Sequence, residues 1–91
     1  RVVDTEDPVA DAGPDITVSL GEAAVMDGSG SSDDKGISSF EWKVENGAET
    51  VFLRGESISF IFSAPGTYNV TLTVSDQAGK QDTDQLQVTV R

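Results

Sequence analysis

Hydrophobic and polar residues alternate with a period of two along most of this chain. Successive side chains of a β-strand point to opposite faces, so such alternation predicts a strand with one buried face. The pattern is clearest in five stretches, at residues 16–20, 40–44, 58–62, 68–74 and 86–90. Two weaker strands are expected in "EAAVMDG" at 22–28 and in the ragged segment 49–53.

The same alternation predicts which side chains point inward. They are Ile16, Val18, Leu20, Ala24, Met26, Phe40, Trp42, Val44, Ile58, Phe60, Phe62, Tyr68, Val70, Leu72, Val74, Leu86, Val88 and Val90. Trp42 is expected to be the largest residue of the core. Tyr68 follows "PGT" and opens the longest strand, so its hydroxyl is expected to bond the preceding turn, as in a tyrosine corner.

Turn-forming residues separate the predicted strands. Gly, Pro, Asn and Asp gather in "AGPD" at 12–15, "ENGAE" at 45–49, "APGT" at 64–67 and "DQAGK" at 76–80. No stretch has a helical period. We therefore predict an all-β fold, an immunoglobulin-like β-sandwich of about seven antiparallel strands. The domain is expected to span residues 8–91, with the acidic segment 1–7 as a linker or N-terminal arm.

Charge and composition exclude several classes of function. The chain has 16 acidic and 6 basic residues and a net charge of −10. Nucleic acids and anionic membranes are bound through Lys and Arg, so we expect no nucleic-acid binding. The sequence has no apolar run of ~18 residues, so we expect no membrane insertion. Cysteine and histidine are absent, which removes disulfides, thiol nucleophiles and the commonest general base. We expect a monomeric isolated domain without enzymatic activity.

The loop "MDGSGSSDDKG", residues 26–36, has three possible interpretations: a phosphate-binding loop, a metal site or a plain turn. Phosphate binding is excluded because the G-x-x-x-x-G-K-[ST] spacing is missing and the carboxylates would repel the anion. An EF-hand is excluded because the twelfth position is Ser38 rather than Glu. As a plain turn, the loop would use Gly28, Gly30 and Gly36 for positive φ angles.

A calcium site remains possible through the topology. In an immunoglobulin-like sandwich the chain start, the loop between the second and third strands and the last hairpin lie at one end. Asp11, Asp33 and Asp76 would then supply the hard oxygens that calcium prefers. Lys35 argues against the ion, because its ammonium could form a salt bridge and supply the positive charge itself. Calcium is therefore a hypothesis, with the plain turn as its alternative.

The outward-facing residues of the predicted strands are mostly hydroxyl and amide side chains. They include Thr17, Ser19, Asn69, Thr71, Thr73, Gln87 and Thr89. Such a polar face could contact a glycan or a fibrous protein. Asn69-Val70-Thr71 also matches the N-glycosylation acceptor pattern, although an ordinary exposed asparagine would look the same.

Two long segments resemble the polycystic kidney disease (PKD) repeat, over about residues 8–90. They are "PVADAGPDITVSLGEAAVMDGSGSSDDKGISSFEW" and "FSAPGTYNVTLTVSDQAGKQDTDQLQVTV". They carry its A-x-A-G-x-D opening, its D-G-S-x-S-x-D loop, its aromatic-x-W strand and its P-G-T-Y-x-V-T-L-x-V-x-D strand. Two departures stand out: "WKVENG" replaces the family's W-D-F-G-D-G, and Lys35 replaces the second aspartate of D-x-D-G.

The resemblance implies a non-catalytic module that is extracellular or on the cell surface. PKD repeats are immunoglobulin-like, occur in tandem and are regarded as spacers and adhesion units, so neighbouring domains of the same chain are expected partners, with an extracellular protein or glycan as a further one. Asp33 and Asp76 match acidic positions of calcium-binding members. The alternative function is an accessory domain of a secreted hydrolase that binds polysaccharide or collagen.

Overall fold

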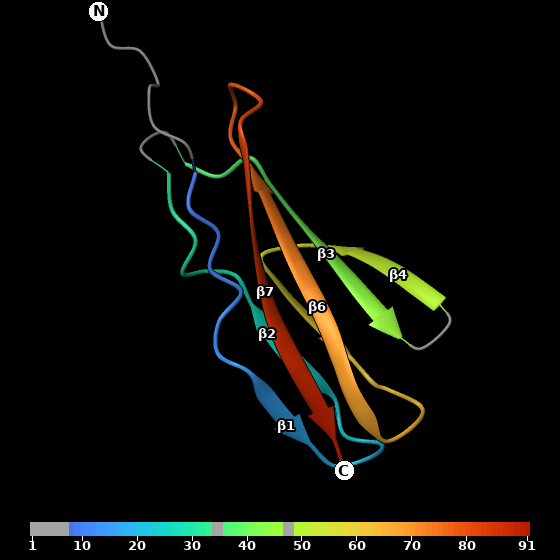
Figure 1. The fold of residues 1–91 in the computed structure, drawn as a ribbon. Coiled ribbons are helices and arrows are strands. Elements are labelled where there is room, and N and C mark those ends of the chain that lie inside the picture. The colour runs from blue at the N-terminus through green and yellow to red at the C-terminus, as the bar shows by residue number, and fades with distance from the viewer. Residues whose placement is uncertain (1–7, 34–35, 47–48) are drawn as a thin grey trace, which may run out of the picture.

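The computed structural model describes residues 8–33, 36–46 and 49–91. These residues form seven strands (Figure 1): β1 (Ile16–Val18), β2 (Ala24–Asp27), β3 (Ser39–Asn46), β4 (Glu49–Arg54), β5 (Ser57–Phe60), β6 (Gly66–Ser75) and β7 (Gln81–Val90). The predicted all-β class is confirmed. Across these same residues there is no helix long and apolar enough to cross a membrane. The predicted arm at 1–7 lies outside the described residues, so the domain boundary at residue 8 stays a prediction.

The strands form two sheets that enclose a common core. One sheet has the order β1-β7-β6-β3-β4, and the other contains β2 and β5. Neighbouring strands run antiparallel except β1 and β7, which are parallel over Ile16–Val18 and Val88–Val90. The prediction of antiparallel strands is wrong for this pair. The described chain starts at the end of the sandwich where β7 begins, so β1 and β7 run in the same direction (Figure 1).

The longest hairpin shows how alternation sets the register. β6 and β7 pair from Gly66 opposite Val90 to Ser75 opposite Gln81. On β6, Val70 is buried and Asn69 is exposed. A shift of one residue would turn every hydrophobic side chain of the strand to the solvent, so burial of one face specifies the pairing.

The core lies between the two sheets. Its buried hydrophobic residues are Ala12, Ala24, Met26, Trp42, Val44, Phe62, Val70, Leu72, Val74, Leu86, Val88 and Val90. Leu20 was expected here, but it is 51% exposed. β1 ends at Val18, and a turn follows in which the backbone N–H of Glu22 donates to the Ser19 carbonyl at 2.9 Å. The alternation therefore stops before Leu20.

Trp42 is fully buried, as predicted. Its ring N–H donates to the Gly55 carbonyl at 2.8 Å, so the one polar atom of the side chain is paired inside the core. Leaving that donor without a partner would cost about 1–3 kcal/mol. The indole thus fastens β3 to the segment between β4 and β5, which joins the two sheets.

Tyr68 forms the predicted tyrosine corner. Its hydroxyl donates to the Ala64 carbonyl, four residues earlier. Its ring stacks on Phe62 with a centroid distance of 4.4 Å. The bond and the stacking together fix the turn that carries the chain from β5 into β6.

Candidate functional site

The site residues predicted from the sequence belong to one end of the sandwich, which we call the loop end. It consists of the described residues of the segments 8–13, 28–33 and 76–80. In Figure 1 the start of the described chain and the β6–β7 turn both lie there, opposite the C-terminus. The predicted site residues Asp11, Asp33 and Asp76 all belong to these segments.

The loop after β2 is built as a turn. The Asp27 carboxylate accepts a bond from the backbone N–H of Ser29 at 2.9 Å. This bond and a second one from the Ser29 hydroxyl hold the pKa of Asp27 below its ordinary value of 3.8. The Ser31 N–H then donates to the Gly28 carbonyl at 2.9 Å. Local carboxylate and backbone bonds therefore account for the first half of this loop.

The glycines of the loop serve a different purpose from the one expected. Only Gly36 has a positive φ, at 91°, and the prediction is wrong for Gly28 and Gly30. A Cβ on Gly28 would lie 3.1 Å from both Leu72 Cδ2 and Trp42 Cζ2. Glycine suits this position because the loop crosses directly over the core, where an added Cβ would press on its neighbours.

Asp11 lies beside this loop, as the topology predicted. Its backbone N–H donates to the Ser31 hydroxyl at 2.9 Å. Its carboxylate accepts from the Gly13 N–H at 2.9 Å. A Cβ on Gly30 would stand 2.6 Å from Asp11 Oδ2, so the carboxylate packs directly against the loop backbone. The chain start and the loop are thus in contact through Asp11.

Asp76 is buried in the β6–β7 turn, with 3% of its surface exposed. Its Oδ1 accepts from the backbone N–H groups of Ala78 at 2.9 Å and Lys80 at 3.0 Å. Gly79 has a φ of +87°, which closes the turn. Asp76 Oδ2 is buried and has no hydrogen-bond partner among the described residues.

The three predicted ligands do not form a metal cluster on their own. Within residues 8–33, 36–46 and 49–91 there is no group of three or more acidic side chains placed to hold an ion. Asp33 is half-buried in the loop. Lys35, on which the alternative explanation depended, lies outside the described residues. Calcium binding therefore stays a prediction.

Two further aspartates define this end of the molecule and were not predicted from the sequence. Asp82 Oδ2 accepts from the backbone N–H of Ala10 at 2.8 Å, and Asp84 Oδ2 accepts from that of Ala12 at 2.8 Å. We call these bonds, together with the bond from the Gln87 N–H to Asp15 Oδ1 at 2.9 Å, the aspartate clamp.

A signal for the clamp was present in the sequence. Asp82 and Asp84 share the parity of the inward-facing Leu86 along β7, and they stand opposite the core residues Val74 and Leu72. Carboxylates at inward positions need partners, since a buried polar group without a hydrogen bond is costly. Alternation alone could show that partners exist, but not that the chain start supplies them.

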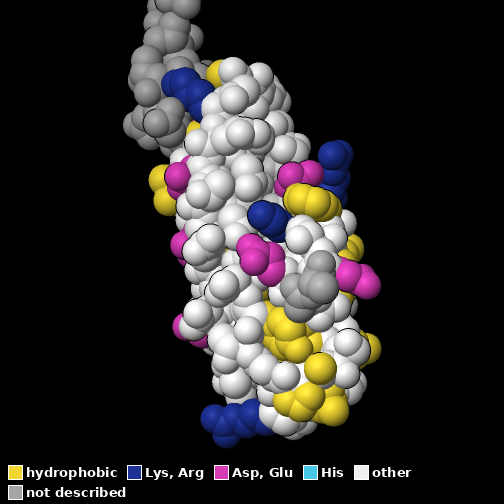
Figure 2. Space-filling model, turned by 45° about the vertical axis from the view of Figure 1, so that its right-hand side comes forward, with side chains coloured by type: hydrophobic (Ala, Val, Ile, Leu, Met, Phe, Trp, Pro, Cys, Tyr) yellow, Lys and Arg dark blue, Asp and Glu magenta, His cyan; other side chains and the backbone are white. Residues whose placement is uncertain are grey.

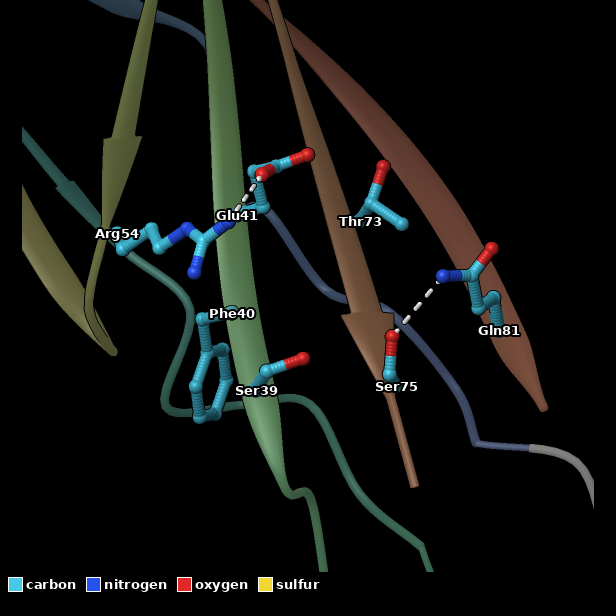
Figure 3. A pocket seen from close by; sticks show the side chains of 7 residues that line it. All are labelled: Ser39, Phe40, Glu41, Arg54, Thr73, Ser75 and Gln81. Carbon is cyan, nitrogen blue, oxygen red and sulfur yellow. Dashed lines mark hydrogen bonds and ion pairs between the residues drawn. The ribbon is translucent and has the colours of Figure 1, made fainter. Parts of the chain in front are cut away.

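A second candidate region is the outer face of the five-stranded sheet. It contains a half-open hollow of about 210 Å³ lined by Ser39, Phe40, Glu41, Arg54, Thr73, Ser75 and Gln81. Figure 3 shows Arg54 reaching Glu41, at 3.5 Å, and Gln81 donating to the Ser75 hydroxyl, at 3.2 Å. The hollow offers one carboxylate, one guanidinium, hydroxyls and an amide, with Phe40 at its wall.

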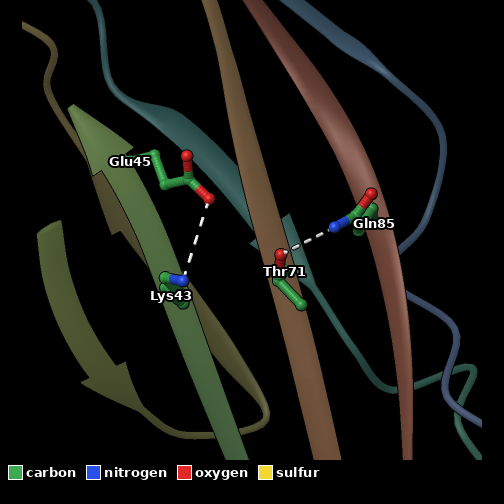
Figure 4. A network of polar contacts seen from close by, with 4 residues as sticks. All are labelled: Lys43, Glu45, Thr71 and Gln85. Carbon is green, nitrogen blue, oxygen red and sulfur yellow. Dashed lines mark hydrogen bonds and ion pairs between the residues drawn. The ribbon is translucent and has the colours of Figure 1, made fainter. Parts of the chain in front are cut away.

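Next to the hollow the outer face carries weak polar pairs. Gln85 donates to the Thr71 hydroxyl at 3.2 Å across β6 and β7, and Lys43 lies 3.9 Å from Glu45 on β3 (Figure 4). Exposed ion pairs of this kind contribute about 0–1 kcal/mol. The face is therefore free to exchange these contacts for bonds to a ligand at little cost.

Comparison with known proteins identifies a family. The sequence matches the PKD domain over residues 5–90. It is 40% identical over 88 residues to human dyslexia-associated protein KIAA0319 and 33% identical over 87 residues to human low-density lipoprotein receptor-related protein 11. These matches cover 92% and 91% of this chain but only 8% and 17% of those proteins. The chain thus spans less than a fifth of their length.

Two solved structures share the fold. The solution structure of the PKD domain from KIAA 1837 protein has a TM-score of 0.76 and 30% identity, and covers 100% of this chain and 92% of that one. A carbohydrate-binding module of the β-sandwich superfamily has a TM-score of 0.74 over 97% of this chain and 36% of its own. Its identity is 23%, so this likeness concerns the fold alone.

Proposed function

The chain belongs to the PKD domain family, and we propose that it is a non-catalytic extracellular module, a structural spacer and adhesion unit of a larger protein. Two sequence facts support a non-catalytic role: the chain has neither histidine nor cysteine. The extracellular location is supported by the name of one relative, a receptor-related protein. The small share of each relative that this domain matches supports a role as one unit among several.

The observation that carries the spacer role is the placement of the chain ends. The described chain begins at the loop end, where Val9 bridges to Ser32, and it finishes at Arg91 at the opposite end (Figure 1). β7 runs between these ends, and its ten residues span about 33 Å. A domain connected in this way adds its long dimension to a tandem array.

The bonding between the two terminal segments suits a module under tension. Pulling on the ends draws the segment 8–18 and β7 in opposite directions. The aspartate clamp, the β1–β7 pairing and the Arg91 N–H bond to the Val18 carbonyl lie across that direction. Bonds perpendicular to the strands are loaded side by side and must break together, which raises resistance to forced unfolding.

Single-molecule pulling of tandem copies tests the spacer role. We expect Asp82→Ala combined with Asp84→Ala to lower the unfolding force, because the segment 8–12 would then peel away before β1. Glu49→Ala removes an exposed carboxylate from the edge strand β4 and is the matched control. Equal unfolding forces for the wild type and the double variant would contradict this load path.

Surface labelling of the intact parent protein tests the location. We expect a membrane-impermeant biotin reagent to label this domain on living cells, and a protease added outside to release it. A parent protein that is protected from both reagents in intact cells would overturn the extracellular assignment, whatever the outcome of the pulling experiment.

Adhesion and contact with neighbouring domains are supported by surface hydrophobic residues. Figure 2 shows hydrophobic side chains gathering toward the end of the molecule at which the C-terminus lies. Leu20, which bonds Arg91 at that end, is 51% exposed. A following domain would cover such residues. We expect a two-domain fragment to be more stable than the isolated domain by thermal unfolding, whereas identical transitions would count against the contact.

The hollow of the outer face favours a second candidate function, an accessory domain that binds polysaccharide or collagen. Its mixture of a carboxylate, a guanidinium, hydroxyls and an amide matches the bonding groups of a sugar, and the half-buried Phe40 offers an apolar wall. A pull-down on insoluble polysaccharides and collagen, compared with Arg54→Ala, tests it. Retention that the variant does not reduce would exclude this hollow as the contact.

Calcium is a subsidiary proposal at the loop end. Asp76 Oδ2, buried and without a described partner, would be one ligand, and carbonyl oxygens of the loop would supply others. Calorimetric titration at millimolar calcium, with magnesium as the control, tests it. Heat and thermal stabilisation that Asp76→Asn abolishes would support the site, and the absence of both in the wild type would remove it.

A further inference from the structure

The tripeptide Asn69-Val70-Thr71 lies in the middle of the sandwich wall, on β6. Val70 points into the core and is fully buried. Asn69 and Thr71, one residue to either side, therefore point to the outer face, since alternate residues of a strand share a face. Both residues of the N-glycosylation pattern that carry its chemistry are thus on the solvent side of the sheet.

The side-chain nitrogen of Asn69, Nδ2, is accessible for the attachment of a substituent. Asn69 is exposed, and its Oδ1 accepts a bond from Gln87 Nε2 at 3.4 Å. This orients the oxygen toward β7 and leaves Nδ2 on the other side of the planar amide. Among the hydrogen bonds of the described residues, none uses Asn69 Nδ2. The nitrogen can therefore carry a substituent without loss of a bond that holds the fold.

The surroundings of Asn69 also leave room for a large substituent. β2 and β5 pack on the opposite face of the five-stranded sheet, so no described strand covers the outer face at this point. The next outward side chains on the neighbouring strands are Gln87 on β7 and Glu45 on β3, and both are exposed. A bulky group at Asn69 would extend into solvent over polar residues.

We propose that Asn69 is a site of N-linked glycosylation. Asn69 Nδ2 forms a bond to C1 of the reducing-end sugar of an oligosaccharide carried on a lipid diphosphate. The bond between C1 and the diphosphate oxygen breaks, the lipid diphosphate leaves with the electron pair, and the amide nitrogen releases one proton. The Thr71 hydroxyl completes the acceptor pattern that the transferring enzyme reads.

The glycan divides the outer face into two parts. It covers the part of the face around Asn69 and Thr71, while the hollow, lined on β6 by Thr73 and Ser75, begins two residues beyond Thr71 and four beyond Asn69, at about 3.3 Å per residue. Contacts with a partner are then directed to the hollow and the ends of the sandwich. This inference rests on the proposed extracellular function, because the oligosaccharide is added only in the secretory pathway.

Secretion of this domain from mammalian cells tests the proposal. With a secretion signal attached, the wild type is expected to migrate more slowly on a gel than its calculated mass predicts, and peptide N-glycosidase F should remove the difference. Mass spectrometry after that digestion should find aspartate at position 69. Asn69→Gln and Thr71→Ala should each lose the enzyme-sensitive shift completely.

Two conservative variants serve as controls. Thr71→Ser keeps the acceptor pattern and should keep the shift, and Asn46→Gln changes the other asparagine, which is followed by "GA" and lies outside any acceptor pattern. A wild-type domain that is secreted and folded but shows no enzyme-sensitive shift would overturn the proposal. That result would leave the extracellular function intact, because the location of the parent protein is measured separately by surface labelling.

Discussion

The backbone N–H of Ala12 donates to the carboxylate of Asp84 at 2.8 Å, although 72 positions separate the two residues in the sequence. This bond takes the place of a strand pairing at the start of the chain. Asp84 stands on the inward side of β7, opposite the buried Leu72, and is half-buried itself. The first described residues are therefore held by side chains of the last strand before β1 joins the sheet.

Asp84→Ala is expected to lower the free energy of unfolding by about 1–3 kcal/mol, because the backbone N–H of the buried Ala12 loses its acceptor. Chemical denaturation measures the change. Asp84→Asn keeps a side-chain oxygen in the same place and should recover part of the loss. An alanine variant as stable as the wild type would show that the bond does not hold the chain start.

Trp42→Ala is expected to cost about 3–5 kcal/mol, because it leaves a cavity at the centre of the core. Trp42→Phe keeps most of the apolar volume but removes the N–H that bonds the Gly55 carbonyl, and it should cost less. Thermal or urea unfolding distinguishes the two variants. A small loss for Trp42→Ala would mean that the core does not depend on this side chain.

Gly28→Ala is expected to destabilise the domain by about 1–3 kcal/mol, because its Cβ would press on Leu72 and Trp42 inside a packed core. Gly30→Ala is the comparison in the same loop, since its Cβ would meet Oδ2, Cγ and Cβ of Asp11, an exposed side chain that can turn aside into solvent, rather than the packed core. Equal losses for the two variants, measured by urea unfolding, would contradict the close approach of the loop to the core.

Asp27 is expected to make the free energy of unfolding depend on pH in the acid range. Bonds from Ser29 lower its pKa in the folded state below the ordinary value of 3.8. A group with a lowered folded-state pKa stabilises the protein above its unfolded-state value, and this contribution is lost as the pH falls through the folded-state value. The stability difference between the wild type and Asp27→Asn should therefore be complete above pH 3.8 and shrink below it. A difference that stays constant across this range would contradict the assignment.

The sequence was sufficient for the strands and for most of the core. Alternation with a period of two is a local property of the sequence. A strand that buries one face keeps its hydrophobic residues on that face, so it cannot pair in a register shifted by one residue. Trp42, Leu72 and Val88 were assigned to the interior on this basis and are fully buried. The tyrosine corner was predictable for the same reason, because Tyr68 bonds a carbonyl only four residues away.

Only the tertiary structure decided which distant segments meet. The parallel pairing of β1 with β7, the exposure of Leu20 and the bonds from Ala10 and Ala12 to β7 all depend on the end of the sandwich at which the chain enters. The role of Gly28 likewise depends on the core beneath it rather than on its own φ angle. Contacts between residues far apart in the chain leave no periodic trace in the sequence, because each partner satisfies its local pattern whether or not the other is near.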